Sequence, residues 1–178
     1  LLSQTNPILE DMPFVEGNLP SGHRVGIRTG LPTAYWRLVN QGVQPSKSTS
    51  TLVDEQTGML EAWSSVDKDA AAIGGNVNGF RMSEAKAFIE SMNQEMAQTV
   101  FYGNSSASPE EFNGLAIRYS AISGATNAQN IITGSGAGSD NSSIYLVGWS
   151  PETVFGVYPK GSKAGLVHDD FGCIPESN

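Results

Sequence analysis

The sequence predicts an α+β fold with an extended N-terminal segment, one long helix and a strand-rich region after the helix. Three observations support this prediction. Each proline removes a backbone donor and favours an extended residue before it, and the first 32 residues contain four of them: Pro7, Pro13, Pro20 and Pro32. An apolar stripe with the period of a helix runs from 83 to 102. Strand-forming residues are concentrated in 143–149 and 153–158.

Length and composition exclude several classes of protein. A chain of 178 residues with 39% hydrophobic and 16% charged residues is long enough for one domain and too apolar for general disorder. No apolar run approaches the ~20 residues that a membrane-spanning helix needs. The single cysteine, Cys173, excludes an intramolecular disulfide scaffold and a multi-cysteine zinc site. A net charge of −8 argues against a protein that grips a phosphate backbone.

The first half of the chain predicts extended structure that is poorly able to bury itself. Residues 24–29 alternate apolar and basic side chains as an edge strand does, and 33–43 is rich in strand formers. The segments 51–53 and 59–63 flank a five-residue loop that ends in Gly58, which predicts a hairpin. Because neither of its arms has a continuous apolar face, we expect this hairpin to need a partner.

A helix is predicted from Ser83 to Tyr102. Ser83 is a suitable N-cap, Glu84 lies in the first turn, and Gly103 supplies a stop. The apolar stripe consists of Ala85, Phe88, Ile89, Met92, Met96 and Val100. A helix of this length measures ~30 Å and is expected to support a sheet. After it, 143–149 and 153–158 are expected to pair as a second hairpin across the turn at 150–152.

Charge is distributed in two adjoining blocks of opposite sign. Residues 17–53 contain four basic and no acidic side chains, whereas 54–69 contains five acidic side chains and only Lys68 as a base. Such blocks suit either a hairpin or subunits packed head to tail. Together with two tryptophans of the extended region they give our candidates for contacts between subunits: Arg28, Trp36, Arg37, Lys47, Asp54, Glu55, Glu61 and Trp63.

Catalytic and ligand-binding motifs are not evident. The sequence His168-Asp169-Asp170 contains metal-ligand types, but adjacent side chains do not converge on one face and no second cluster accompanies them. The glycine-rich 134–138 has no Gly-Lys-Ser/Thr ending, and no Gly-x-Ser-x-Gly elbow occurs. We therefore expect no enzyme activity, no cofactor and no metal site.

The sequence resembles the major capsid proteins of tailed bacteriophages, in a podovirus-type subgroup whose shell fold is shared with herpesviruses. The resemblance covers nearly the whole chain. The segments that carry it are 28–33 (RTGLPT), 36–38 (WRL), 40–48 (NQGVQPSKS), 58–63 (GMLEAW), 93–98 (NQEMAQ), 101–104 (FYGN), 147–149 (VGW) and 158–166 (YPKGSKAGL).

The resemblance implies a division of the chain into the parts of that capsid fold. These are an N-terminal arm at 1–30, an extended two-stranded E-loop at 31–72, a peripheral domain at 73–116 with the spine helix 83–102, and the first part of the axial domain at 117–178. Members of the family continue beyond the position of Asn178, so we expect a chain that is truncated at its C-terminus. Because the chain opens without a methionine, we also expect it to be processed or incompletely represented at its start.

The resemblance also implies a function. The chain is expected to be a structural subunit that assembles with copies of itself into hexamers and pentamers of an icosahedral shell around double-stranded DNA, without binding the DNA specifically. Scaffolding, portal and decoration proteins would be further partners. No membrane would be involved, and the virion capsid, built in the host bacterial cytoplasm, would be its location. Two alternatives are a β-rich decoration or adhesin-like binding module, and a hydrolase that uses His168 and Asp169.

Overall fold

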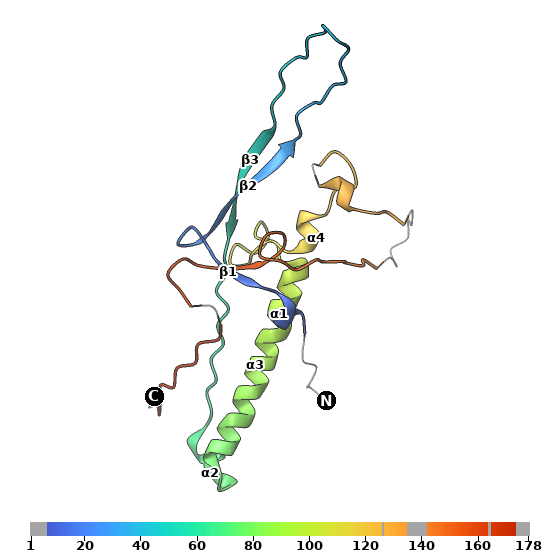
Figure 1. The fold of residues 1–178 in the computed structure, drawn as a ribbon. Coiled ribbons are helices and arrows are strands. Elements are labelled where there is room, and N and C mark those ends of the chain that lie inside the picture. The colour runs from blue at the N-terminus through green and yellow to red at the C-terminus, as the bar shows by residue number, and fades with distance from the viewer. Residues whose placement is uncertain (1–6, 126, 135–141, 164, 174–178) are drawn as a thin grey trace.

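The computed structural model describes residues 7–125, 127–134, 142–163 and 165–173, and it shows an elongated molecule (Figure 1). A two-stranded hairpin projects beyond one end of a long helix, and a second small sheet lies near the junction between them (Figure 1). The elements, in chain order, are α1 (Ile8–Asp11), β1 (Phe14–Glu16), β2 (Gly22–Gly30), β3 (Thr49–Gln56), α2 (Lys68–Ile73), α3 (Val77–Tyr102), α4 (Leu115–Arg118), the 3-10 turn η1 (Ala128–Asn130) and β4 (Gly156–Tyr158). The mixture of helix and strand agrees with the predicted α+β class.

The elongated shape leaves much of the chain exposed. Its accessible surface is 14709 Å², whereas a compact monomer of this mass would expose roughly 8,300 Å². Among the described residues the buried apolar side chains are few: Met12, Ala71, Ala97 and Val100. Because burial of apolar surface is the main favourable term in folding, a chain with so small a core is expected to gain stability by packing against other chains.

Helix α3 confirms the predicted long helix and its end at Tyr102, but the predicted start at Ser83 is wrong. The helix begins at Val77, and the side chain of Asn76 caps it by accepting a hydrogen bond from the Gly79 amide at 2.9 Å. Asparagine is a favoured N-cap because its side-chain oxygen satisfies an amide of the first turn. The glycine at 79 conceals this first part of the helix in the sequence.

The apolar stripe of α3 is packed unevenly along the helix. Val100 and the neighbouring Ala97 are buried near α4, whereas Ile89 is 49% exposed in the middle of the helix. The other expected core residues of the stripe are only half-buried: Ala85, Phe88, Met92 and Met96. The packed part of the molecule therefore lies at the end of α3 from which the hairpin projects.

The projecting hairpin consists of β2 and β3, paired antiparallel from Gly22 opposite Gln56 to Gly30 opposite Thr49, with a register shift between Arg28 and Gly30. The predicted strand at 24–29 is confirmed. The predicted pairing of 51–53 with 59–63 is wrong, because β3 continues through the residues that we expected to form the turn. β2 belongs to the segment that we assigned to the N-terminal arm, and the division into domains remains a prediction.

The loop 31–48 that joins β2 to β3, here called the hairpin loop, contains no strand, although its sequence is rich in strand formers. Every one of its residues is exposed. Strand-forming side chains favour a pleated surface only where neighbours pack against them. Such neighbours are absent around this loop in the described part of the chain.

The second sheet pairs two distant parts of the chain. β1 and β4 are parallel, with Val15 opposite Val157. The predicted hairpin of 143–149 with 153–158 is wrong: the isolated bridge found there joins Ser150, in the expected turn, to Val154, and only the end of the second segment forms a strand. The N-terminal segment supplies that strand's partner, which adjacency in the sequence does not reveal.

Candidate assembly surfaces

The hairpin loop exposes several large apolar side chains. Its side chains are held by few contacts, such as the hydrogen bond from the Ser46 hydroxyl to the Thr33 carbonyl at 2.9 Å. Trp36 is fully exposed, at 104% of its reference area. The exposed apolar side chains of the loop are Leu31, Tyr35, Trp36, Leu38, Val39 and Val43. Large apolar side chains exposed together on one loop are typical of an interaction site.

The basic candidates lie on the same hairpin. Arg28 is near the end of β2, and Arg37 and Lys47 are in the hairpin loop. The side chains of all three are exposed. Arg37 donates a hydrogen bond to the Gln41 carbonyl at 3.4 Å, which is a weak contact within the loop itself. The outer half of the hairpin is therefore both apolar and positively charged.

Two of the acidic candidates are engaged within the chain. Arg24 donates to both carboxylate oxygens of Asp54 across the hairpin, at 2.5 and 2.6 Å. These hydrogen bonds lower the pKa of Asp54 below its usual range, although both side chains are half exposed. Glu55 is paired with Arg118 of α4. Contacts of Asp54 and Glu55 with another subunit remain predictions. The ion pairs within the chain compete with such contacts.

Glu61 and Trp63 also have partners in their own chain. The indole nitrogen of Trp63 donates to Glu61 at 3.0 Å, and its ring stacks on Phe171 with centroids 5.1 Å apart. Arg81 of α3 pairs with Asp170, next to Phe171, at 2.9 Å. The Gly172 amide, with Arg81 second, lowers the pKa of Asp170. Trp63 is still 59% exposed, so a contact with a neighbouring chain remains a prediction.

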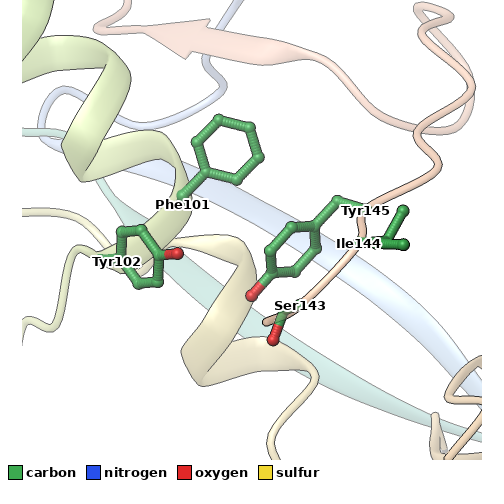
Figure 2. Close-up of a pocket in the computed structure, with 5 residues that line it drawn as sticks. All are labelled: Phe101, Tyr102, Ser143, Ile144 and Tyr145. Atoms are coloured by element: carbon green, nitrogen blue, oxygen red, sulfur yellow. The ribbon is translucent and has the colours of Figure 1, made fainter. Parts of the chain in front are cut away.

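A second exposed apolar surface lies at the packed end of α3. A hollow of about 410 Å³ is lined by Phe101, Tyr102, Ser143, Ile144 and Tyr145. Figure 2 shows the rings of Phe101 and Tyr145 facing each other there, with centroids 5.3 Å apart. Ile144 and Leu146 are fully exposed on the extended segment 142–149. This surface is the second place at which another chain could pack.

The residue types of the sequence His168-Asp169-Asp170 are those of metal ligands, so their surroundings were compared with those of a metal site. In the ranges that the structure describes, no three His, Cys, Asp or Glu side chains are grouped so that they could hold a metal ion. Within the sequence 168–170, Asp170 forms an ion pair with Arg81 of α3. None of the helices in the described ranges is long and apolar enough to cross a membrane.

The sequence did not reveal several residues that organise the hairpin. Arg24 and Arg118 pair with the acidic end of β3, and the Gln56 side chain donates to the carbonyls of Pro109 and Glu111 at 3.3 and 2.6 Å. The opposite charges of the two blocks were visible in the sequence. The register that brings Arg24 opposite Asp54 was not.

A comparison with protein families decides which family the chain represents. The model described as "Major capsid protein GP7" matches residues 1–175. The chain belongs to the major capsid protein GP7 family. The predicted relationship to the major capsid proteins of tailed phages is therefore confirmed. Capsid proteins are structural proteins of the virus particle.

Solved structures include a relative of this GP7-family chain. The near-atomic cryo-EM structure of bacteriophage Epsilon15 has a chain with 41% sequence identity and a TM-score of 0.47. The alignment covers 63% of the present chain and 33% of the Epsilon15 chain, so it spans about a third of that chain's length. No curated protein sequence matches.

Proposed function

We propose that this chain is part of a major capsid subunit that assembles with copies of itself into the hexamers and pentamers of an icosahedral phage shell. The family match over residues 1–175 carries the proposal. The physical properties of the chain support it, because a surface of 14709 Å² and a small core suit a protein that is completed by its neighbours. Location in the virion capsid, after assembly in the host cytoplasm, is part of the same proposal.

In this proposal the hairpin acts as the E-loop and α3 as the spine helix of the peripheral domain. Closed rings are built from heterologous contacts, so each subunit presents two different surfaces that fit each other. The hairpin loop, with Trp36 at its apolar surface, is one of them. Its partner is a surface on the body of the next subunit.

The proposed role is structural and needs no cofactor or metal. The chain would form a container for double-stranded DNA, and its net charge of −8 disfavours tight binding of that DNA. Scaffolding, portal and decoration proteins are further proposed partners.

Expression of the protein followed by sedimentation velocity and electron microscopy tests this function. We expect particles with rings of subunits, formed in a concentration-dependent manner. A protein that remains monomeric at high concentration and yields no particles would contradict the proposal. Binding of that monomer to preformed shells or to cells would instead favour the alternative of a decoration or adhesin-like module.

Charge on the hairpin is expected to influence the rate of assembly. Arg28→Glu combined with Arg37→Glu should slow assembly at low salt, because a basic hairpin attracts an acidic neighbour during encounter. Each exposed pair contributes only ~0–1 kcal/mol, and salt at 0.1 M screens charges beyond ~10 Å, so the defect should shrink as salt is raised. Light scattering during assembly, recorded at several salt concentrations, measures the effect.

The control changes net charge equally but elsewhere: Lys160→Glu combined with Lys163→Glu, both exposed and outside the hairpin. Equal slowing by the two double variants would show that only net charge matters. Adding Asp54→Lys and Glu55→Lys is not expected to rescue the hairpin variant, because those changes break the ion pairs with Arg24 and Arg118.

A further inference from the structure

The base of the hairpin is attached to the body of the molecule by two consecutive side chains of β3. Glu55 accepts hydrogen bonds from both terminal nitrogens of the Arg118 guanidinium, one of them at 2.7 Å. Gln56 donates to the carbonyls of Pro109 and Glu111, in the turn region between α3 and α4. Consecutive side chains of a strand point to opposite faces, so these contacts hold the hairpin from both of its faces.

Arg118 connects more of the molecule than this one ion pair. Its Nε donates to the Asn113 carbonyl at 3.0 Å, and its own carbonyl accepts a hydrogen bond from the Asn127 side chain. The side chains of Arg118 and Glu55 are 37% and 24% exposed, which makes theirs the least exposed ion pair of the described residues. Arg118 is therefore held by Asn113 and Asn127 in the body of the molecule, in addition to its contact with the hairpin.

We propose that Arg118 is a positioning residue that sets the angle at which the hairpin projects from α3. A guanidinium that binds a carboxylate through two parallel hydrogen bonds fixes orientation as well as distance. The ladder between β2 and β3 is internal to the hairpin and does not constrain this angle. His23, which is opposite Glu55 in the ladder, adds an edge contact with the Phe155 ring at 6.1 Å.

The angle matters because the hairpin is a long lever. A nine-residue strand such as β2 measures ~30 Å, so a rotation of ~10° at its base moves its far end by ~5 Å. A displacement of that size takes the hairpin loop out of register with any surface that it contacts. The consequence for shell assembly rests on the proposed function, whereas the angle itself is a property of the single chain.

Distance measurement by pulsed electron paramagnetic resonance on the unassembled protein tests the proposal. Spin labels at Ser50→Cys in β3 and Ser91→Cys in α3, both exposed, with Cys173→Ser to remove the native thiol, report the angle. Arg118→Gln is expected to broaden the distance distribution and to shift its mean by several Å. Arg118→Lys should restore it only in part, because an ammonium group cannot make two parallel hydrogen bonds.

Three further variants separate positioning from general destabilisation. Arg24→Gln removes an ion pair within the hairpin and should leave the distribution narrow. Glu55→Gln breaks the link from the hairpin side and leaves the contact of Arg118 with the Asn113 carbonyl in place, so it should broaden the distribution even if Arg118→Gln fails to fold. Exchange of the two charges, Arg118→Glu with Glu55→Arg, should narrow it again.

Two results would overturn the inference: an unchanged distribution in both Arg118→Gln and Glu55→Gln, or equal broadening in Arg24→Gln. The proposed function fails separately, if the unmodified protein forms no particles. If both the positioning role of Arg118 and the proposed capsid function hold, the variants with a broadened distance distribution should also assemble more slowly than the Arg24→Gln variant.

Discussion

Replacement of Trp36 by alanine is expected to abolish shell assembly and to leave the fold of the single chain unchanged. Trp36 is fully exposed in the hairpin loop, so its removal takes no packing from its own chain. Tryptophan is enriched among the residues that dominate protein interfaces, where truncation costs ~2 kcal/mol or more. Because the same contact recurs around a closed ring, this loss is repeated at every subunit boundary.

Sedimentation velocity and electron microscopy measure the loss of particles, and circular dichroism of the unassembled protein shows whether its fold is retained. Trp36→Phe keeps an aromatic ring and should retain part of the assembly. Ile73→Ala, an 87% exposed apolar residue at the end of α2, is the control outside the hairpin. Normal particle yield from Trp36→Ala would mean that the hairpin loop does not anchor a neighbour.

The parts of the fold that the sequence predicts well are those with local causes. The end of α3 follows from a periodic stripe and a glycine after Tyr102, and the strand at 24–29 follows from alternation. The start of α3 was missed because Gly79 interrupts the helical pattern that Asn76 begins. The pairing of β1 with β4, and of β2 with β3, depends on which distant segments meet, and propensity carries no information on that.

The candidate residues divide in the same way. Exposure of Trp36, Arg28, Arg37 and Lys47 was expected from a segment without a face to bury, and the structure leaves these side chains open. Asp54, Glu55, Glu61 and Trp63 take partners within the chain. Opposite charge blocks predict attraction but do not distinguish a neighbour in the same chain from one in another. The register of the β2–β3 hairpin determines which charged residues meet within the chain.

Replacement of Gly114 by alanine is expected to destabilise the packed end of α3 strongly. The Gly114 amide donates to the Gly103 carbonyl at 2.8 Å, which brings the start of α4 against the end of α3. A Cβ at Gly114 would lie 2.7 Å from the Thr99 carbonyl oxygen and 2.8 Å from the Gly103 nitrogen. These are backbone atoms, so no side chain can rotate away to make room.

The expected loss is steric rather than conformational, because φ −80° and ψ 178° at Gly114 suit any residue. Overpacking of this kind costs ~1–3 kcal/mol and sometimes more, against a total of ~5–15 kcal/mol for an ordinary domain. The cost is a larger fraction of the total free energy of unfolding here, since few side chains are buried near α3 apart from Ala97 and Val100. Separation of α4 from α3 would also carry Arg118 away from Glu55 and release the hairpin.

Urea unfolding of the unassembled protein, followed by circular dichroism, measures this loss as a lower midpoint. Gly148→Ala is the matched control, because a Cβ at Gly148 meets nothing within 4 Å. That variant should unfold at the same midpoint as the unmodified protein or slightly above it, since alanine narrows the unfolded ensemble. Equal midpoints for the two alanine variants would show that α4 is not held against α3 by the close approach at Gly114. In that case the hairpin would have to be positioned through Gln56 and the 103–114 turn alone.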